Sequence, residues 1–197
     1  MDTIIFDLGG VILKDKPISV LDNLNINKND YQELTKFFTN WNDLDLGKIS
    51  LKDKLDECNF SNNILDKYKD LLLTFYEKRP INMELIDLIN SLKKRNYNIY
   101  ILSDNNKEAY LYYKNHEFFK NIDGWVVSCN YNTVKKDGKL FAILLNKYNL
   151  DASKCLFIDD NSNNIDIAKN YGIKGFLFNN DTYEELYKLI SEVKDCS

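Results

Sequence analysis

Short apolar runs alternate with longer amphipathic stretches through most of this chain. A continuous run of four or five apolar residues between polar or glycine-containing joints is typical of a buried strand. The first run covers residues 3–6. Gly9-Gly10 interrupts it, and residues 11–13 continue it as an apolar segment that we also expect to be a buried strand. Further runs predict strands at residues 99–102, 125–128, 155–158 and 175–178.

Between these runs, apolar residues recur every three or four positions, which is the period of a helix with one buried face. This pattern predicts helices at about residues 83–92, 107–119, 140–148, 165–171 and 182–193. From residue 80 onward, strands and helices therefore alternate, and such alternation predicts a parallel sheet with helices on both faces. We expect a Rossmann-like α/β fold, in which ligands bind at the carboxyl ends of the strands.

Residues 15–79 have a different character, because strand patterns are nearly absent there and helical periodicity dominates. We predict a small all-helical domain at 15–79, inserted into an α/β core domain that comprises residues 1–14 and 80–197. Four aromatic residues of this insert are expected mainly to form its core, although they could also line a pocket: Phe37, Phe38, Trp41 and Tyr76.

Composition narrows the possible functions. Hydrophobic residues make up 44% of the 197 residues, which indicates a packed globular chain. The net charge of -4 disfavours a nucleic-acid or anionic-membrane surface, and no apolar run approaches the length of a membrane span. The single histidine, His116, is expected at the surface rather than in a catalytic role.

The cysteines do not form a metal-binding pattern. They are separated from one another and no histidine cluster accompanies them, which disfavours a zinc site. Without a signal-peptide pattern, we expect a cytoplasmic location and reduced thiols. The four residues are Cys58, Cys129, Cys155 and Cys196.

Polar groups directly follow three of the apolar runs, as Asp7, Ser103-Asp104 and Asp159-Asp160. If these strands are neighbours, the groups meet in one cleft, where clustered carboxylates repel one another. A hard cation such as Mg²⁺ removes that cost, and a remaining carboxylate can attack an electrophile such as phosphorus. One aspartate alone would mean little, because aspartate is a common turn former and helix N-cap.

Four stretches of the chain have the order and spacing of a known set of motifs. They are Phe6-Asp7-Leu8-Gly9-Gly10-Val11, Leu102-Ser103-Asp104-Asn105, Lys135-Lys136-Asp137-Gly138-Lys139-Leu140-Phe141 and Phe157-Ile158-Asp159-Asp160-Asn161-Ser162-Asn163-Asn164. Together they resemble the four motifs of the haloacid dehalogenase (HAD) superfamily of hydrolases. Leu46-Gly47-Lys48-Ile49-Ser50 also resembles part of the helical cap in the subgroup whose cap lies between the first two motifs. The resemblance covers nearly the whole chain, and such a cap closes over the cleft and selects the substrate.

This resemblance implies a role for each matching residue. Asp7 would be the nucleophile, which forms an aspartyl-phosphate. Lys135 would balance the charges of Asp7 and of the phosphoryl group. Ser103, the backbone N–H of Asp104 and the neighbouring Asn105 would bind the phosphate of the substrate.

The resemblance also implies Mg²⁺ as cofactor. Asp7, the carbonyl of Gly9 and Asp160 would bind the metal. Asp159 would lie beside it, and Asn164, one helical turn on, would support its waters. The implied reaction is hydrolysis of a small phosphorylated metabolite, such as a sugar phosphate, with catalysis mainly by positioning and charge.

One departure concerns acid–base catalysis. HAD phosphatases usually carry an aspartate two residues after the nucleophile as general acid and base, and here that residue is Gly9. General acid–base catalysis contributes about 10²–10⁴ in rate. We therefore expect a preference for good leaving groups, such as sugar 1-phosphates and acyl phosphates. The chain resembles the sugar-1-phosphate phosphatase-like subgroup with Asp-Leu-Gly in the first motif.

A second departure concerns the third motif, which has Lys136 where the family has proline. Lys135 and Lys136 could therefore exchange roles, and the register of Asp137 and Phe141 favours Lys135.

Two alternative functions stay open at this level. A 2-haloacid dehalogenase would use the same nucleophile without metal, but it typically has an aromatic residue at the position of Gly9, and the Asp159-Asp160 pair favours a metal. A catalytically degenerate binding protein is supported only by Gly9. The sequence leaves open the substrate and the choice between monomer and homodimer. Three polar residues of the insert could hydrogen-bond a sugar: Asn40, Asn42 and Asp43.

Overall fold

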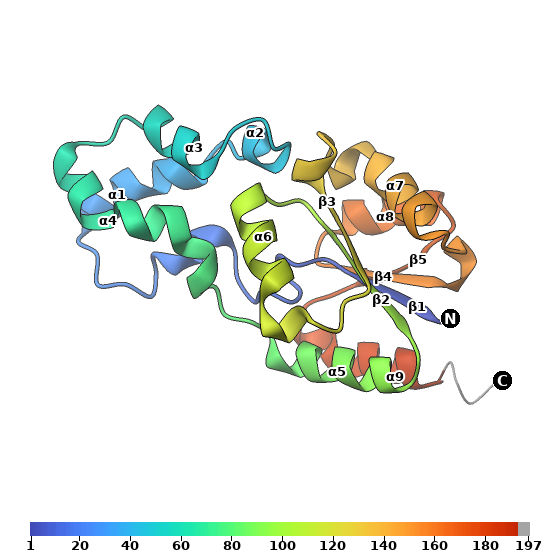
Figure 1. The fold of residues 1–197 in the computed structure, drawn as a ribbon. Coiled ribbons are helices and arrows are strands. Elements are labelled where there is room, and N and C mark those ends of the chain that lie inside the picture. Colours follow the sequence, from blue (N-terminus) through green and yellow to red (C-terminus); the bar gives the residue numbers. More distant parts are fainter. Residues whose placement is uncertain (193–197) are drawn as a thin grey trace.

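A sheet of parallel strands runs through the part of the chain that the structure, a computed structural model, describes, residues 1–192. Its strands are β1 (Thr3–Phe6), β2 (Asn98–Ser103), β3 (Gly124–Val127), β4 (Cys155–Asp159) and β5 (Lys174–Leu177), in the order β3-β2-β1-β4-β5 (Figure 1). In the middle strand, Phe6 lies opposite Ile101 of β2 and Ile158 of β4. The carboxyl ends of these three strands therefore lie side by side.

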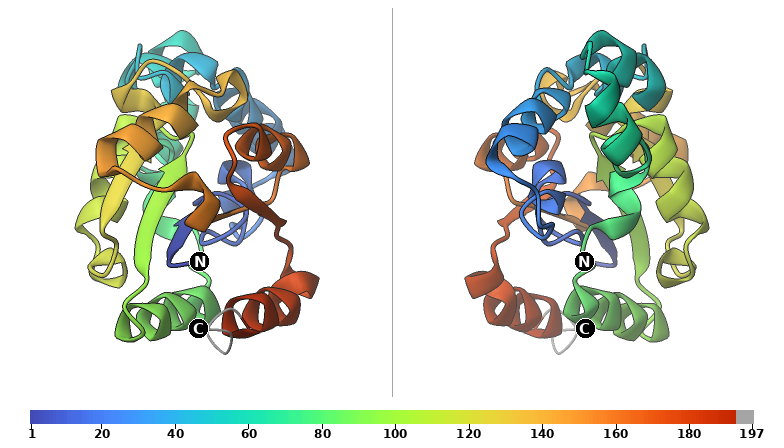
Figure 2. Two further views of the ribbon diagram at one scale, coloured as in Figure 1. Left: turned by 90° about the vertical axis from the view of Figure 1, so that its right-hand side faces the viewer. Right: turned by 90° about the vertical axis from the view of Figure 1, so that its left-hand side faces the viewer.

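Helices cover both faces of this sheet (Figure 1 and Figure 2). Along β1, Ile4 and Phe6 contribute to one hydrophobic cluster and Ile5 to the other, because successive side chains of a strand point to opposite faces. The Rossmann-like α/β arrangement expected from the alternating pattern is confirmed. On the first face lie α5 (Met83–Lys94), α6 (Lys107–Asn115) and α9 (Tyr183–Glu192), and on the second lie α7 (Lys139–Tyr148) and α8 (Ser162–Asn170).

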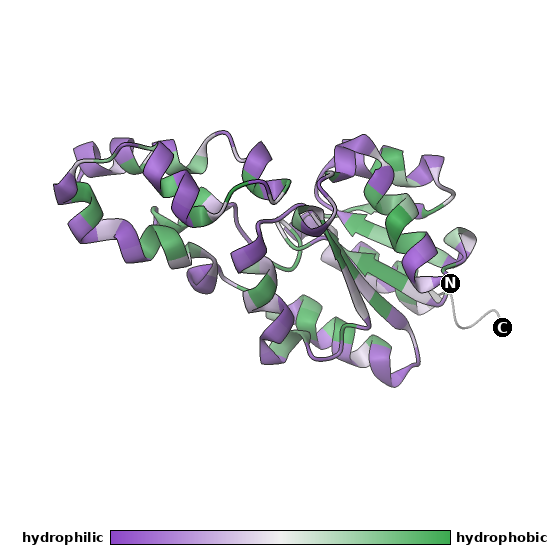
Figure 3. Ribbon diagram, turned by 45° about the horizontal axis from the view of Figure 1, so that its top comes forward, coloured by the Kyte–Doolittle hydropathy of each residue, from purple (hydrophilic) through white to green (hydrophobic). Residues whose placement is uncertain are grey.

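Residues 17–78, between β1 and α5, form a helical insert with a hydrophobic core of its own. Leu34, Phe37, Leu55 and Phe75 are among its buried members, each at most 3% exposed. The insert lies beyond the carboxyl ends of the strands (Figure 1), and hydrophilic residues cover its outer turns (Figure 3). Its elements are η1 (Pro17–Val20), α1 (Lys28–Thr35), η2 (Lys36–Phe38), α2 (Asn42–Asp45), α3 (Leu51–Glu57), α4 (Asn62–Thr74) and η3 (Phe75–Lys78).

Close contacts fix the insert against the core. The backbone N–H of Leu51, at the start of α3, donates to Glu108 Oε1 of α6 at 3.1 Å. Gly47, in the turn after α2, has φ +69°, and a Cβ atom there would lie 2.2 Å from the carbonyl oxygen of Cys129. This turn therefore approaches the loop after β3 more closely than a side chain allows. The result is that α2 faces the ends of the strands.

The apolar run at residues 11–13 is not a strand as expected. Leu8 O accepts hydrogen bonds from the N–H groups of Val11 and Leu13, so the chain turns tightly here, and Leu13 forms only isolated bridges. All three side chains of the run are fully buried. The apolar pattern thus reflects burial of a turn, which periodicity over three residues cannot distinguish from a strand.

The ends of several other elements differ from expectation by a few residues. The helix predicted for 107–119 ends at Asn115, because His116 has extended backbone angles and accepts from Phe118 N–H to cap η4 (Glu117–Phe119). α8 begins at Ser162, three residues early, with Asn161 as its N-cap. Val193 and Cys196 lie outside the described residues. Over residues 1–192, none of the helices combines the length and apolar character needed to cross a membrane.

Candidate active site

The carboxylate of Asp7 follows the middle strand directly and is almost fully buried. Its Oδ1 accepts from Leu8 N–H at 2.7 Å, and its Oδ2 lies 2.7 Å from Lys135 Nζ. Lys135 begins η6 (Lys135–Asp137), and its Nζ also lies 2.7 Å from Asp159 Oδ2. Burial opposes the charge of Lys135, but the carboxylates of Asp7, Asp159 and Asp104 outweigh burial and raise its pKa. One protonated lysine therefore holds two carboxylates from neighbouring strands.

Asp159, at the end of β4, is fully buried and fully hydrogen-bonded. Besides Lys135, Asn161 donates its backbone N–H to Asp159 Oδ1 at 2.8 Å, and Asn164 Nδ2 donates to both carboxylate oxygens at 3.1 Å. Asn164 is thus placed one turn into α8 as expected, but its amide supports a carboxylate. This arrangement makes Asp159 a rigid partner of the lysine.

Asp160, the next residue, is exposed and points into the space beside the loop after β1. Gly10 has φ +74°, and a Cβ atom there would lie 2.1 Å from Asp160 Oδ2. Glycine at position 10 therefore serves two needs. It supplies a left-handed backbone conformation, and it leaves room for this carboxylate. Gly9 precedes it, and its carbonyl belongs to the same turn.

The oxygen donors at the strand ends fit a hard divalent cation. One carboxylate oxygen from each of Asp7, Asp159 and Asp160 lies within 4.8 Å of the other two. Burial, opposed by Lys135 and reinforced by Asp159, raises the pKa of Asp7 to about 7. Burial and the charge of Asp159 also raise the pKa of Asp160. A cation with oxygen ligands, such as Mg²⁺, relieves this repulsion, so the donor set matches that metal.

The end of β2 supplies polar groups on the other side of Asp7. Ser103 is 1% exposed, and its hydroxyl makes only a long 3.5 Å contact with the carbonyl of Asp104. The Asp104 carboxylate accepts from the backbone N–H of Lys135 at 2.9 Å, which fixes the loop of the third motif. The backbone N–H of Asn105 donates to Ser128 Oγ. Asp104 and Asn105 are partly exposed and line a cavity, whereas Ser103 is buried.

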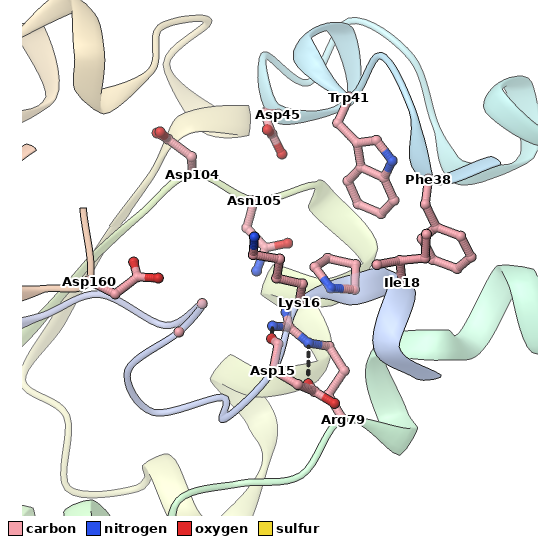
Figure 4. A pocket seen from close by; sticks show the side chains of 13 residues that line it. Asp15, Lys16, Ile18, Phe38, Trp41, Asp45, Arg79, Asp104, Asn105 and Asp160 are labelled. Carbon is pink, nitrogen blue, oxygen red and sulfur yellow. Dashed lines mark hydrogen bonds and ion pairs between the residues drawn. The ribbon is translucent and has the colours of Figure 1, made fainter. Parts of the chain in front are cut away.

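A cavity of about 380 Å³ lies between the strand ends and the helical insert (Figure 4). Asp7 and Lys135 are buried and do not line it, but Gly9 and Asp160, which neighbour them, do. The linkers of the insert form one wall, where Arg79 donates to both the carbonyl and the carboxylate of Asp15. On the core side, the cavity is lined by Gly9, Gly10, Asp104, Asn105 and Asp160. On the side of the insert and its linkers, it is lined chiefly by Lys16, Ile18, Phe38, Trp41 and Asp45.

Asp45, the last residue of α2, was not expected from the sequence to belong to the site. Burial, followed by the charge of Asp104, raises its pKa to about 7, with Lys135 opposing and Asp7 adding to the rise. A signal for it exists in the sequence, because Asp45 lies four residues after Trp41 and so shares its side of a helical turn. Both residues face the cavity (Figure 4).

The other residues considered in the insert are divided between core and cavity. Phe37 is fully buried in the core of the insert. Phe38 and Trp41 pack there too, with their rings stacked at 6.0 Å, and they also line the cavity. Tyr76 packs against the core of the insert, beside Phe75, and also contacts Tyr112 of α6.

The three polar residues of the insert that were considered as sugar contacts, and Lys136, do not line the main cavity. Asp43 pairs with Lys48 on the surface, and Asn40 does not line the cavity. Asn42 and the exposed Lys136 line a separate small hollow, which Asp45 and Asp104 also reach. His116 is part-buried near Tyr76 and does not line the main cavity.

These features define a class of protein, a parallel α/β enzyme with a carboxylate centre at the strand ends. A family model described as a haloacid dehalogenase-like hydrolase matches residues 1–172. Because this match covers most of the chain, the protein belongs to that family of hydrolases. The resemblance noted in the four motifs is thereby confirmed.

Known relatives agree with this assignment. The chain is 26% identical to a D-ribitol-5-phosphate phosphatase of Bacteroides thetaiotaomicron over 188 residues, 88% of this chain and 89% of the relative. Among solved structures, a HAD-family enzyme of the same organism, an Asp12Ala mutant in complex with magnesium and inorganic phosphate, matches with a TM-score of 0.70 at 20% identity, over 95% of this chain and 98% of the other. The L-2-haloacid dehalogenase of Xanthobacter autotrophicus matches with a TM-score of 0.62 at 14% identity, over 89% and 76% of the two chains. At these identities the structural matches show a shared fold.

Proposed function

We propose that this protein is a Mg²⁺-dependent phosphatase that hydrolyses a small phosphorylated metabolite through an aspartyl-phosphate on Asp7. The observation that carries the proposal is the placement of Asp7, whose carboxylate lies 2.7 Å from Lys135 and within 4.8 Å of Asp159 and Asp160. A nucleophile for a phosphate monoester must tolerate a negatively charged substrate. This cluster, with its buried lysine and a metal, provides the positive charge that such a step needs.

Each residue has a defined task in this reaction. An oxygen of Asp7 forms a bond to phosphorus as the bond to the leaving oxygen breaks, and water then cleaves the aspartyl-phosphate. Lys135 holds Asp7 in place and balances the phosphoryl charge. Asp7, the Gly9 carbonyl and Asp160 would hold Mg²⁺, which would supply further positive charge to the reacting phosphoryl group.

We extend the proposal to a polyol or sugar phosphate as substrate class. The cavity combines the flat apolar rings of Phe38 and Trp41 with the hydrogen-bonding groups of Lys16, Asp45 and Asn105. Such a mixture suits a ligand that has both C–H surface and hydroxyl groups. The D-ribitol-5-phosphate phosphatase among the relatives, which matches this chain over most of its length, supports the same class. The helical insert serves as the cap that closes over this ligand.

Phosphate release tests this function directly. Purified protein would be assayed with Mg²⁺ or EDTA against 4-nitrophenyl phosphate, acetyl phosphate, ribitol 5-phosphate and sugar 1- and 6-phosphates. We expect Mg²⁺-dependent release that the Asp7→Asn variant loses by about 10³-fold or more, because the nucleophile is absent. No release by a folded protein that binds Mg²⁺ would instead indicate a binding protein, and metal-independent chloride release from 2-chloropropionate would indicate a dehalogenase.

The same assay separates the two lysines. Lys135 is 2% exposed between two carboxylates, whereas Lys136 is exposed. Lys135→Ala leaves Asp7 and Asp159 facing each other in a buried site, so we expect loss of activity and a loss of stability of about 3–5 kcal/mol. Lys136→Ala is the matched control. We expect its activity to stay within about a factor of two of the wild type and its free energy of unfolding to stay within about 0.5 kcal/mol. The reverse result would assign the catalytic role to Lys136.

A further inference from the structure

The proposed phosphatase reaction requires a proton that the first motif does not supply. When the bond between phosphorus and an alkyl oxygen breaks, the leaving alkoxide is a strong base and must be protonated. Gly9 has no side chain at the position where a proton donor is expected. A Cβ atom at Gly9 would find its nearest neighbour 4.0 Å away, at Arg79 Nη2, so the space is open and contains a guanidinium edge, which is a poor proton donor. The donor must therefore come from another element.

The carboxylates near the cavity can be sorted by their partners. Asp7 is the nucleophile, and Asp159 is saturated by Lys135 and Asn164. Asp15 is paired with Arg79, and Asp104 accepts from the backbone of Lys135. Each of these carboxylates is thus already engaged by another residue of the protein.

Two carboxylates of the cavity wall are left. Asp160 belongs to the metal set. For Asp45, the side chain has no hydrogen bond or ion pair to any residue within 1–192, and it lines the cavity (Figure 4). Asp45 is therefore an uncommitted carboxyl group that faces the place where substrate binds.

The position of Asp45 is fixed by the fold. The Asp45 N–H donates to Trp41 O at 2.9 Å, which closes the single turn of α2. Two residues later, Gly47 packs against the Cys129 backbone, closer than any side chain permits. The carboxyl group thus lies on the insert side of the cavity, across from Asp160 (Figure 4).

We propose that Asp45, contributed by the helical insert, is the general acid and base of this enzyme in place of the missing aspartate at position 9. The proposal rests on the phosphatase function above. Protonated Asp45 gives its proton to the leaving oxygen as the P–O bond breaks and Asp7 bonds to phosphorus. The resulting carboxylate then takes a proton from the water that attacks the aspartyl-phosphate. Inorganic phosphate leaves, and Asp7 and protonated Asp45 are regenerated.

The electrostatic surroundings of Asp45 agree with this role. Burial and the facing Asp104 raise its pKa to about 7, Lys135 lowers it and Asp7 raises it. Across the cavity it also faces Asp160, and in the adjoining hollow it faces Lys136. A general acid works best when its pKa lies near the operating pH, because both protonation states are then populated.

The dependence of rate on the leaving group tests the inference. The variant Asp45→Asn keeps the shape of the side chain but cannot give or take the proton. We expect kcat/KM for ribitol 5-phosphate, or for the best alkyl phosphate of the wild type, to fall about 10²-fold or more. We expect kcat/KM for acetyl phosphate, whose leaving group needs no proton, to change less than about threefold. Turnover of acetyl phosphate should become limited by hydrolysis, so that the aspartyl-phosphate accumulates.

Two further variants distinguish catalysis from structure. Asp43→Asn, two residues away on the same helix and paired with Lys48 at the surface, should leave both substrates unaffected. Adding Gly9→Asp to Asp45→Asn should restore alkyl phosphate hydrolysis by at least about tenfold, because it supplies a proton donor at an open position. A purely structural role of Asp45 would not give such rescue.

The results of these assays test the role of Asp45 separately from the phosphatase function. Equal losses of kcat/KM for both substrates, or no loss for either, would overturn the role of Asp45, while activity that depends on Asp7 would keep the phosphatase function intact. If the wild type releases phosphate from no substrate, both proposals fail together.

Discussion

At the scale of single residues, the geometry of the metal donors depends on Gly10. An alanine at this position would be destabilised by about 1 kcal/mol because φ is +74°, and its Cβ atom would lie 2.1 Å from Asp160 Oδ2. We therefore expect Gly10→Ala to displace this carboxylate, to raise the Mg²⁺ concentration needed for half-maximal activity at least about tenfold, and to lower stability by about 1–2 kcal/mol. Mg²⁺ titration of activity and urea unfolding measure the two effects.

Gly172 provides the matched control for this substitution. It has φ +79°, but a Cβ atom there would have only Ala152 Cβ nearby, at 3.7 Å. Gly172→Ala should show a similar loss of stability with an unchanged Mg²⁺ requirement. A normal Mg²⁺ requirement in Gly10→Ala as well would remove Asp160 from the proposed metal ligands.

The residues of the site were predictable to the extent that they follow strands. Asp7 comes directly after an apolar run, and Asp104 and Asp160 each follow one with a single polar residue between. Parallel strand ends converge, so the proximity of these groups follows from local pattern and topology. Asp45 was missed because its proximity depends on how the insert packs on the core. The hydrogen bonds of Asn164 to Asp159, rather than to solvent, also depend on a side-chain rotamer that spacing does not specify.

At the scale of elements, the turn between α2 and α3 controls how closely the insert approaches the core. Gly47→Ala places a Cβ atom 2.2 Å from the carbonyl oxygen of Cys129, so the turn must move away. We expect kcat/KM for alkyl phosphates to fall at least about tenfold, because a shift of about 1 Å in a positioning element has effects of that size or larger. Steady-state kinetics measure it, with Gly172→Ala as the control for left-handed strain. Wild-type kinetics in Gly47→Ala would show that docking of α2 does not matter for turnover.

Element types were easier to predict than element ends. The five runs that became strands are all apolar over at least three residues, and four of them lie between helical patterns, so the local pattern and its context agree. Residues 11–13 have the same local pattern but are too few to pair, and they form a buried turn bonded to Leu8. The end of α6 was missed because it depends on the backbone angles of His116, not on hydrophobic period.

At the scale of the whole molecule, two hydrophobic clusters pack on the sheet and a third in the insert, and the cavity between sheet and insert is lined by both aromatic rings and carboxylates. This cleft gathers more carboxylates than cations, and burial raises the pKa of Asp7, Asp45, Asp104 and Asp160. The fold thus opposes ionisation of Asp7 and Asp160, which the proposed nucleophilic attack and metal binding require. We therefore expect the stability of the metal-free protein to depend on pH.

The expected dependence on pH follows from the sign of these shifts. A carboxyl group whose pKa is higher in the folded than in the unfolded state contributes stability that is complete below the unfolded value, near 3.8, and is lost as the pH rises through the folded value. For Asp7 and Asp45 the folded values are about 7. One pKa unit corresponds to about 1.4 kcal/mol, so in EDTA we expect the free energy of unfolding to fall by about 2 kcal/mol or more between pH 5 and pH 8.

Magnesium should reverse this loss at pH 8, because it binds the ionised carboxylates of the folded protein. At a concentration 100 times its Kd it should add about 2.7 kcal/mol. Urea unfolding at pH 5 and pH 8, with EDTA or Mg²⁺, measures both effects. Asp45→Asn should flatten the pH dependence in EDTA, and Asp166→Asn, whose side chain is 70% exposed, should not. Stability that is constant or rises from pH 5 to pH 8 in EDTA would mean that the cleft carboxylates ionise freely in the folded state, and that the metal is not needed to hold them together.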